Sequence, residues 1–121
     1  MNGYLGNIEQ KSLENKYFRE VLFTGPDSQL VVMSLKSGEE IGLEKHELDQ
    51  FLRIETGEAE VTIDGETKTA GDGYAIIVPK GAMHNVKNIG AGDLKLYTIV
   101  DTAEEAFEIV KNAPPREEFY Y

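Results

Sequence analysis

The chain contains 2 histidines, His46 and His84, and each lies in a segment whose other residues could also bind a metal ion. Histidine is the commonest metal ligand in proteins. Glu44 stands two residues before His46, so in an extended segment the two side chains point to the same face. Gln50 shares that parity but follows a bend expected at 47–49, so it can begin the next strand and return to the same centre.

Glu44, His46, Gln50 and His84 together offer imidazole nitrogens, one carboxylate and one amide oxygen. Such ligands suit a divalent transition metal (Fe, Mn, Ni, Zn, Co or Cu) with positions left open for water or substrate. The chain has no cysteine, which excludes disulfides and thiolate chemistry and disfavours a closed structural zinc site. The alternative is that the two histidines are buried, hydrogen-bonded residues of a protein without metal.

The elements that must position these side chains have a hydrophobic period of two, which predicts strands. Asp64-Gly65 stands between two such runs and is typical of a tight β-hairpin. About seven or eight short strands at this spacing, with no helical crossover, predict an all-β sandwich or barrel. The expected strands are 17–24, 29–35, 50–55, 59–63, 66–70, 74–78, 84–88 and 94–100.

The two ends of the chain have different patterns. Residues 1–16 are expected to be irregular or to add an edge strand. Residues 102–112 predict a helix whose apolar face is Ala103, Ala106, Phe107 and Val110. The tail after it is either frayed or packed as an arm on this barrel or on a partner. We therefore expect one domain over 1–121, with a barrel core at 17–101.

Composition excludes several classes of function. The net charge of −10, from 12 basic and 22 acidic residues, repels nucleic acid and favours divalent cations. Hydrophobic residues make up 40% of the chain, enough for a core. No run approaches the roughly 20 apolar residues needed to span a bilayer, and the N-terminus does not resemble a signal peptide. We expect a soluble, cytoplasmic protein that does not bind membranes.

Both histidine segments resemble the two conserved motifs of the cupin superfamily. The first, G-x5-H-x-H-x3,4-E-x6-G, is matched at Gly38, His46 and Gly57, with Glu44 in place of the first His and Gln50 in place of the Glu. The second motif, G-x5-P-x-G-x2-H-x3-N, is matched at every fixed position: Gly73, Pro79, Gly81, His84 and Asn88. The resemblance covers about residues 29–100 and is to small single-domain cupins (type-2 conserved barrel), which are often labelled mannose-6-phosphate isomerase-like.

The resemblance implies a double-stranded β-helix, or jelly-roll barrel, that holds one divalent metal on Glu44, His46, Gln50 and His84. The two exchanged ligands keep the charge at one carboxylate, which implies a retained but harder site. Parity suggests that Leu52, Ile54 and Val86 point inward, that Phe18, Met33, Ile76 and Tyr97 line the wall, and that Arg53 points outward.

The function implied is the binding of a metal and a small polar organic molecule, either as an isomerase or dioxygenase-like enzyme or as a non-catalytic binding or sensor module. No residue is clearly placed as a general base, although Glu47 and Asp49 lie beside the site in sequence. Apolar barrel faces and the additional N-terminal segment suggest a homodimer.

Overall fold

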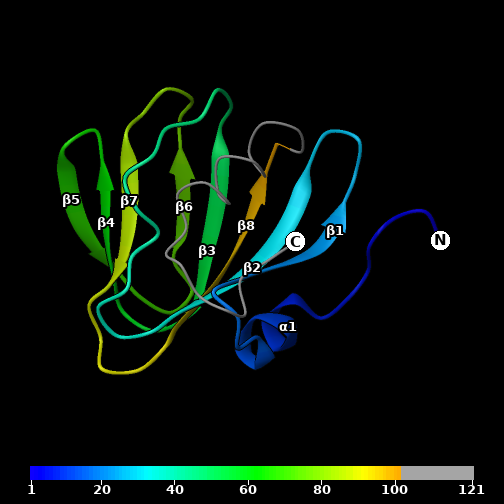
Figure 1. The fold of residues 1–121 in the computed structure, drawn as a ribbon, viewed down its shortest axis with the longest axis horizontal. Coiled ribbons are helices and arrows are strands. Elements are labelled where there is room, and N and C mark those ends of the chain that lie inside the picture. The colour runs from blue at the N-terminus through cyan, green and yellow to red at the C-terminus, as the bar shows by residue number, and fades with distance from the viewer. Residues whose placement is uncertain (102–121) are drawn as a thin grey trace.

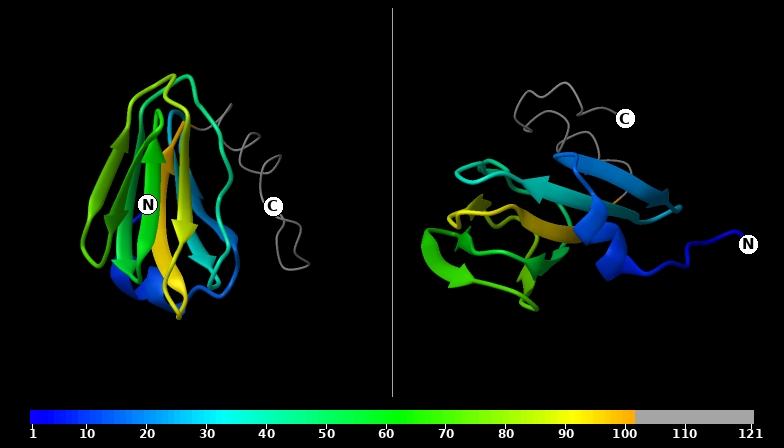
Figure 2. Two further views of the ribbon diagram at one scale, coloured as in Figure 1. Left: turned by 90° about the vertical axis from the view of Figure 1, so that its left-hand side faces the viewer. Right: turned by 90° about the horizontal axis from the view of Figure 1, so that it is seen from below.

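A computed structural model describes residues 1–101 as one short helix and eight strands arranged in two antiparallel sheets (Figure 1). The five-stranded sheet has the order β1-β2-β8-β3-β6, and the three-stranded sheet has the order β5-β4-β7. The two sheets lie as separate layers that face each other (Figure 2). The elements are α1 Ile8–Glu14, β1 Arg19–Thr24, β2 Gln29–Leu35, β3 Gln50–Thr56, β4 Ala59–Ile63, β5 Glu66–Ala70, β6 Ala75–Val78, β7 His84–Asn88 and β8 Leu94–Val100.

The strands β3, β6 and β7 alternate between buried and more accessible positions because each presents one face to the opposite sheet. In β3, Gln50, Leu52 and Ile54 are buried, whereas Arg53 is exposed. Across both sheets the inward residues form one apolar cluster. That cluster contains six of the side chains expected in the interior: Phe18, Met33, Leu52, Ile54, Ile76 and Val86.

The predicted strand pattern is confirmed, with small shifts at the ends of three strands. The first strand begins at Arg19, β3 extends to Thr56, and β6 begins at Ala75. Asp64 and Gly65 form the β4–β5 turn with φ of 48° and 82°, the left-handed pair that a tight hairpin turn requires. The helix predicted at 102–112 lies outside the described residues.

The expectation for the N-terminal segment is wrong, because residues 8–14 form a helix. The side chain of Asn7 caps this helix by accepting a hydrogen bond from the backbone N–H of Gln10 at 3.1 Å. Asn followed three residues later by Gln is a capping-box pattern that marks a helix start. The helix lies at one end of the five-stranded sheet. There Lys95 Nζ donates to Asn15 O at 2.6 Å and to Ser34 Oγ at 3.0 Å.

Tyr97 does not line the barrel interior, which corrects the prediction from sequence. On β8 the residues Leu94, Leu96 and Thr98 are buried, and Tyr97 has the opposite parity. Its ring instead packs edge-on against Phe51 on the outer face, with centroids 6.1 Å apart. Arg53 does point outward as predicted, and its Nε lies 3.0 Å from Glu55 Oε2.

No helix within residues 1–101 has the length and apolar character required to cross a membrane.

Candidate metal centre

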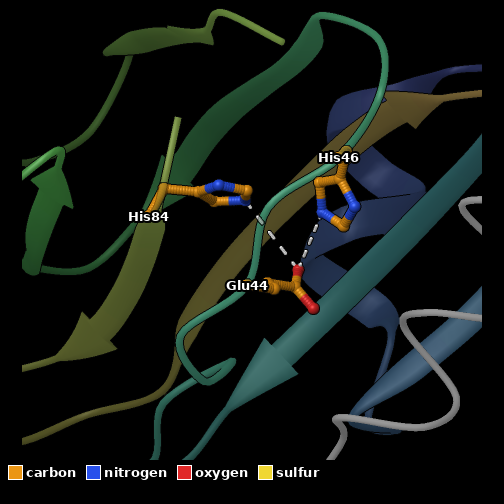
Figure 3. A group of neighbouring side chains, drawn as sticks. All are labelled: Glu44, His46 and His84. Carbon is orange, nitrogen blue, oxygen red and sulfur yellow. Dashed lines mark hydrogen bonds and ion pairs between the residues drawn. The ribbon is translucent and has the colours of Figure 1, made fainter. Parts of the chain in front are cut away.

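Three of the predicted ligands converge between the two sheets (Figure 3). One ligand atom from each of Glu44, His46 and His84 lies within 4.8 Å of the others. Glu44 Oε1 is 3.2 Å from His46 Nε2 and 3.9 Å from His84 Nε2, and the two rings are 5.0 Å apart. All three residues are at least 95% buried. A carboxylate oxygen therefore stands between two imidazole nitrogens in a water-poor interior.

Glu44 and His46 are positioned by a segment that is extended but is not a regular strand. Residues 39–46 run beside β7, as Figure 1 shows, and bridge to it at Glu44 and His84. Glu44 N donates to His84 O at 3.0 Å, and His84 N donates to Glu44 O at 2.9 Å. Within the segment Glu44 and His46 are buried and Lys45 is exposed. The period of two places the side chains of Glu44 and His46 on the same inner face, as predicted.

The turn before His84 is fixed by hydrogen bonds from its backbone N–H groups to one carbonyl and two carboxylates of other segments. Gly81 N donates to His46 O at 2.8 Å, which links the two histidine segments directly. Lys80 N donates to Asp49 Oδ1, and Met83 N donates to Asp64 Oδ1, both at 2.9 Å. Gly81 has φ +82°, a conformation that glycine adopts without strain. The motif glycine therefore shapes this turn and is not a ligand.

Gln50 lies on the inner face of β3 and is 4% exposed. Its Nε2 donates to Thr98 Oγ1 at 3.0 Å, and Thr98 Oγ1 in turn donates to Phe51 O at 2.8 Å. The oxygen Oε1 of Gln50 is buried and has no hydrogen-bond partner among residues 1–101. A buried amide oxygen without a partner costs free energy, and a metal ion or ligand at that position would remove this cost.

The four predicted ligands come from the segments 43–46, 50–55 and 83–87, and these are not all neighbours in one sheet. The first and third are hydrogen-bonded, but β3 belongs to the opposite sheet and pairs with β6 and β8. Gln50 therefore faces the histidine segments across the interior. The acid considered beside the site, Asp49, is exposed and holds the backbone of Lys80.

His84 is poised to act as a neutral ligand through Nε2. Its Nδ1 lies 3.1 Å from Ala82 O, and only a protonated Nδ1 can donate to that carbonyl. Nε2 then carries the lone pair, and it has no hydrogen-bond partner among the described residues. Burial lowers the pKa of His84 below its usual value of 6.5, against the opposing effects of the Ala82 carbonyl and Glu44. A neutral imidazole with a fixed tautomer is the form that binds metal.

The residues present fit a divalent transition metal. The donor set of two imidazoles and one carboxylate is of intermediate hardness, and Gln50 Oε1 is a fourth donor atom, a buried oxygen without a hydrogen-bond partner among residues 1–101. Asn88, the last residue of the second motif, makes hydrogen bonds to the backbone. Its Nδ2 donates to Leu35 O at 2.9 Å and to Gly92 O at 2.8 Å.

Two facing antiparallel sheets with a His/Glu cluster between them define a small double-stranded β-helix protein with a candidate metal centre. The family model described as Cupin domain matches residues 31–100. The chain therefore belongs to the cupin family.

Relatives with similar sequences match most of the length of this chain. It is 42% identical over 115 residues to the uncharacterised protein YrkC of Bacillus subtilis, a match covering 88% of this chain and 61% of that protein. It is 40% identical to the uncharacterised protein L612 of Acanthamoeba polyphaga mimivirus, covering 84% of this chain and 66% of that protein. The chain thus spans less than two thirds of the length of either relative.

Solved structures agree with the fold. The crystal structure of BH2720 from Bacillus halodurans superposes with a TM-score of 0.80 at 41% identity, covering 84% of this chain and 82% of that one. A cupin superfamily protein from Desulfitobacterium hafniense, DSY2733, has a TM-score of 0.64 at 25% identity, covering 74% of this chain and 80% of that one.

Proposed function

We propose that this cupin binds one divalent transition metal (Fe, Mn, Ni, Zn, Co or Cu) through Glu44, His46, His84 and Gln50. The observation that carries the proposal is the convergence of three ligand atoms within 4.8 Å in a buried interior. Supporting it, His84 Nε2 and Gln50 Oε1 are buried polar atoms without hydrogen bonds among the described residues. Relative to the cupin motif, Glu44 replaces a histidine and Gln50 replaces a glutamate, so the proposed ligand set still contains one carboxylate.

A bound metal would supply Lewis-acid or redox chemistry for a small polar organic molecule. The chain's own residues would then orient the site: Ala82 O fixes the His84 tautomer, and Thr98 fixes the Gln50 amide. The candidate reactions are those of an isomerase, on the pattern of the mannose-6-phosphate isomerase-like cupins, or of a dioxygenase.

The test is elemental analysis of the untagged protein beside His46→Ala and Glu44→Gln. We expect close to one equivalent of a transition metal in the wild type and most of it lost in both variants. Glu55→Gln is a matched control, because its carboxylate side chain is only 6% exposed but pairs with Arg53 on the outer face. Wild-type protein that stays free of metal after reconstitution would refute the proposal.

The alternative is a non-catalytic binding or sensor module in which metal is not essential. It is favoured by the fate of Asp49, which is engaged with the backbone of Lys80 and is not a free general base. A molecule that binds equally well to chelator-treated and metal-loaded protein, with no product formed, would favour this module over the enzyme.

We also propose a homodimer that forms through the outer face of the five-stranded sheet. The register places Leu30 opposite Ile99, Ile99 opposite Phe51 and Phe51 opposite Ile77, so one apolar row crosses four strands. Ile77 and Ile99 are 58% and 42% exposed. A continuous apolar row of this kind is typical of an interaction surface. We propose separately that the protein is cytoplasmic, because a chain without cysteine fits a reducing compartment.

A further inference from the structure

A cavity of about 350 Å³ lies between the two sheets, and its lining does not include Glu44, His46 or His84. It is bounded by β5, the end strand of the three-stranded sheet, and by β6, the end strand of the five-stranded sheet. Pockets that bind small molecules typically range from about 300 to about 1,000 Å³. The cavity is therefore large enough for a small metabolite but not for a macromolecule.

The floor of this cavity is apolar. It is formed by Val61 and Ile63 from β4 and by Ile76 from β6. Val61 and Ile76 are 8% and 7% exposed and belong to the main hydrophobic cluster, and Ile63 packs against it. A branched aliphatic group placed there would extend the core and remove apolar surface from water.

Two opposite charges stand at the mouth of the cavity. The register of β4 and β5 places Glu66 opposite Ile63 and Lys68 opposite Val61, so both charged side chains start from the inner face of β5. Lys68 Nζ is 3.6 Å from Glu66 Oε2, and the side chains are 79% and 73% exposed. An ion pair this exposed contributes little to stability, so exchanging it for contacts with a ligand costs little.

We propose that this cavity binds a small zwitterion with an apolar side chain, of the class of the aliphatic α-amino acids. The side chain packs on Val61, Ile63 and Ile76, the ligand's ammonium pairs with Glu66, and its carboxylate pairs with Lys68. A zwitterion satisfies both rim charges at once, whereas a simple acid or amine satisfies one. This site does not need the metal, although Ile63 is also the cross-strand neighbour of His84.

The test uses the full chain after chelator treatment, so that its outcome is independent of the metal proposal. Leucine is the probe, and its binding is monitored by ¹H–¹⁵N NMR of the protein. The analogues 4-methylpentanoate and isoamylamine each lack one of the two charges of leucine. We expect saturable shifts of amides in β4, β5 and β6 with leucine and weaker binding of both analogues. Analogues that bind as tightly as leucine would overturn the assignment of a zwitterion.

Variants test the residues. Lys68→Gln and Glu66→Gln should each weaken leucine binding about two- to five-fold, the range expected for exposed charge pairs. Lys87→Gln is the matched control, because Lys87 lies opposite Glu60 in the same sheet and outside the cavity lining. Ala70→Phe should fill the cavity and abolish binding, while a dispersed spectrum shows that it folds. If leucine causes no saturable shift in wild type, the inference is wrong and the inward charges serve only to block pairing at the sheet edge.

Discussion

The hydroxyl of Thr98 fixes which end of the Gln50 amide faces the centre of the barrel. Thr98 Oγ1 donates its single proton to Phe51 O at 2.8 Å, so toward Gln50 it can only accept, and it does so from Nε2 at 3.0 Å. The amide oxygen is thereby the atom left for the interior. An amide held in this way can offer oxygen to a metal without first breaking a hydrogen bond to the protein.

Thr98→Val should weaken metal binding because it removes the acceptor that orients Gln50. Loss of such an orienting partner typically costs about 10- to 100-fold in affinity. Thr98→Ser keeps the hydroxyl and is the control, with affinity close to that of the wild type. Competition with a chromophoric chelator measures both. Equal affinities in the Val and Ser variants would show that Thr98 does not act through Gln50.

Gln50→Glu should bind divalent metal more tightly than the wild type. The change adds a second carboxylate to the proposed ligand set, and an ionised oxygen is a stronger ligand than an amide oxygen. The same change should lower the stability of the metal-free protein, because two carboxylates then share a buried site. Titration calorimetry and urea unfolding measure the two effects. Unchanged metal affinity would place Gln50 outside the ligand set.

The metal-free protein should lose stability as the pH falls below 6.5. Burial lowers the pKa of His84 in the folded state, so the unfolded chain takes up the proton at a higher pH than the folded chain does. The stability due to neutral His84 is therefore complete above the unfolded pKa and is lost as pH falls toward the folded value. Urea unfolding at about pH 7.5 and about pH 5 should show this decline in wild type and a smaller decline in His84→Asn. An equal loss of stability between the two pH values in wild type and His84→Asn would contradict a lowered pKa of His84 in the folded protein.

Asp64→Ala should destabilise the protein by about 1.5–3.5 kcal/mol, the sum of a lost hydrogen bond and a left-handed alanine. Asp64 has φ 48°, and its Oδ1 accepts the Met83 N–H at 2.9 Å. Asp64→Asn retains an oxygen acceptor and tolerates this φ, so it should lose much less. Because Met83 precedes His84, the Ala variant should also bind metal more weakly. Full metal affinity in a destabilised Asp64→Ala protein would show that this turn does not position the metal ligands.

Ile77→Lys should shift the protein toward the monomer if the outer sheet face is the dimer interface. Ile77 ends the apolar row that continues through Phe51 and Ile99. Leu43→Lys is the control, because Leu43 is 60% exposed but lies in the segment beside β7. Light scattering after gel filtration gives the mass of each variant. A wild-type monomer, or an Ile77→Lys protein that remains dimeric, would overturn the proposed interface.

The sequence alone determined most of the strands and identified three side chains that converge in the candidate metal centre. Alternation is a local property, so it identified β2, β4, β5, β7 and β8 with their observed ends. Glu44 and His46 were identified because parity within an extended segment places both side chains on one face. The second motif then added His84 to them. Asn7 and Gln10 carried the signal for α1, a capping pattern that an irregular composition around it obscured.

Only the tertiary structure decided how the strands combine, because pairing joins residues far apart in the chain. It placed β3 in the sheet opposite the histidine segments and turned Tyr97 outward. It also brought Thr98 to Gln50, a contact between residues 48 positions apart that no local pattern encodes. The same holds for the cavity between β5 and β6: each strand's inner face follows from its own sequence, but the space between them depends on how the two sheets pack.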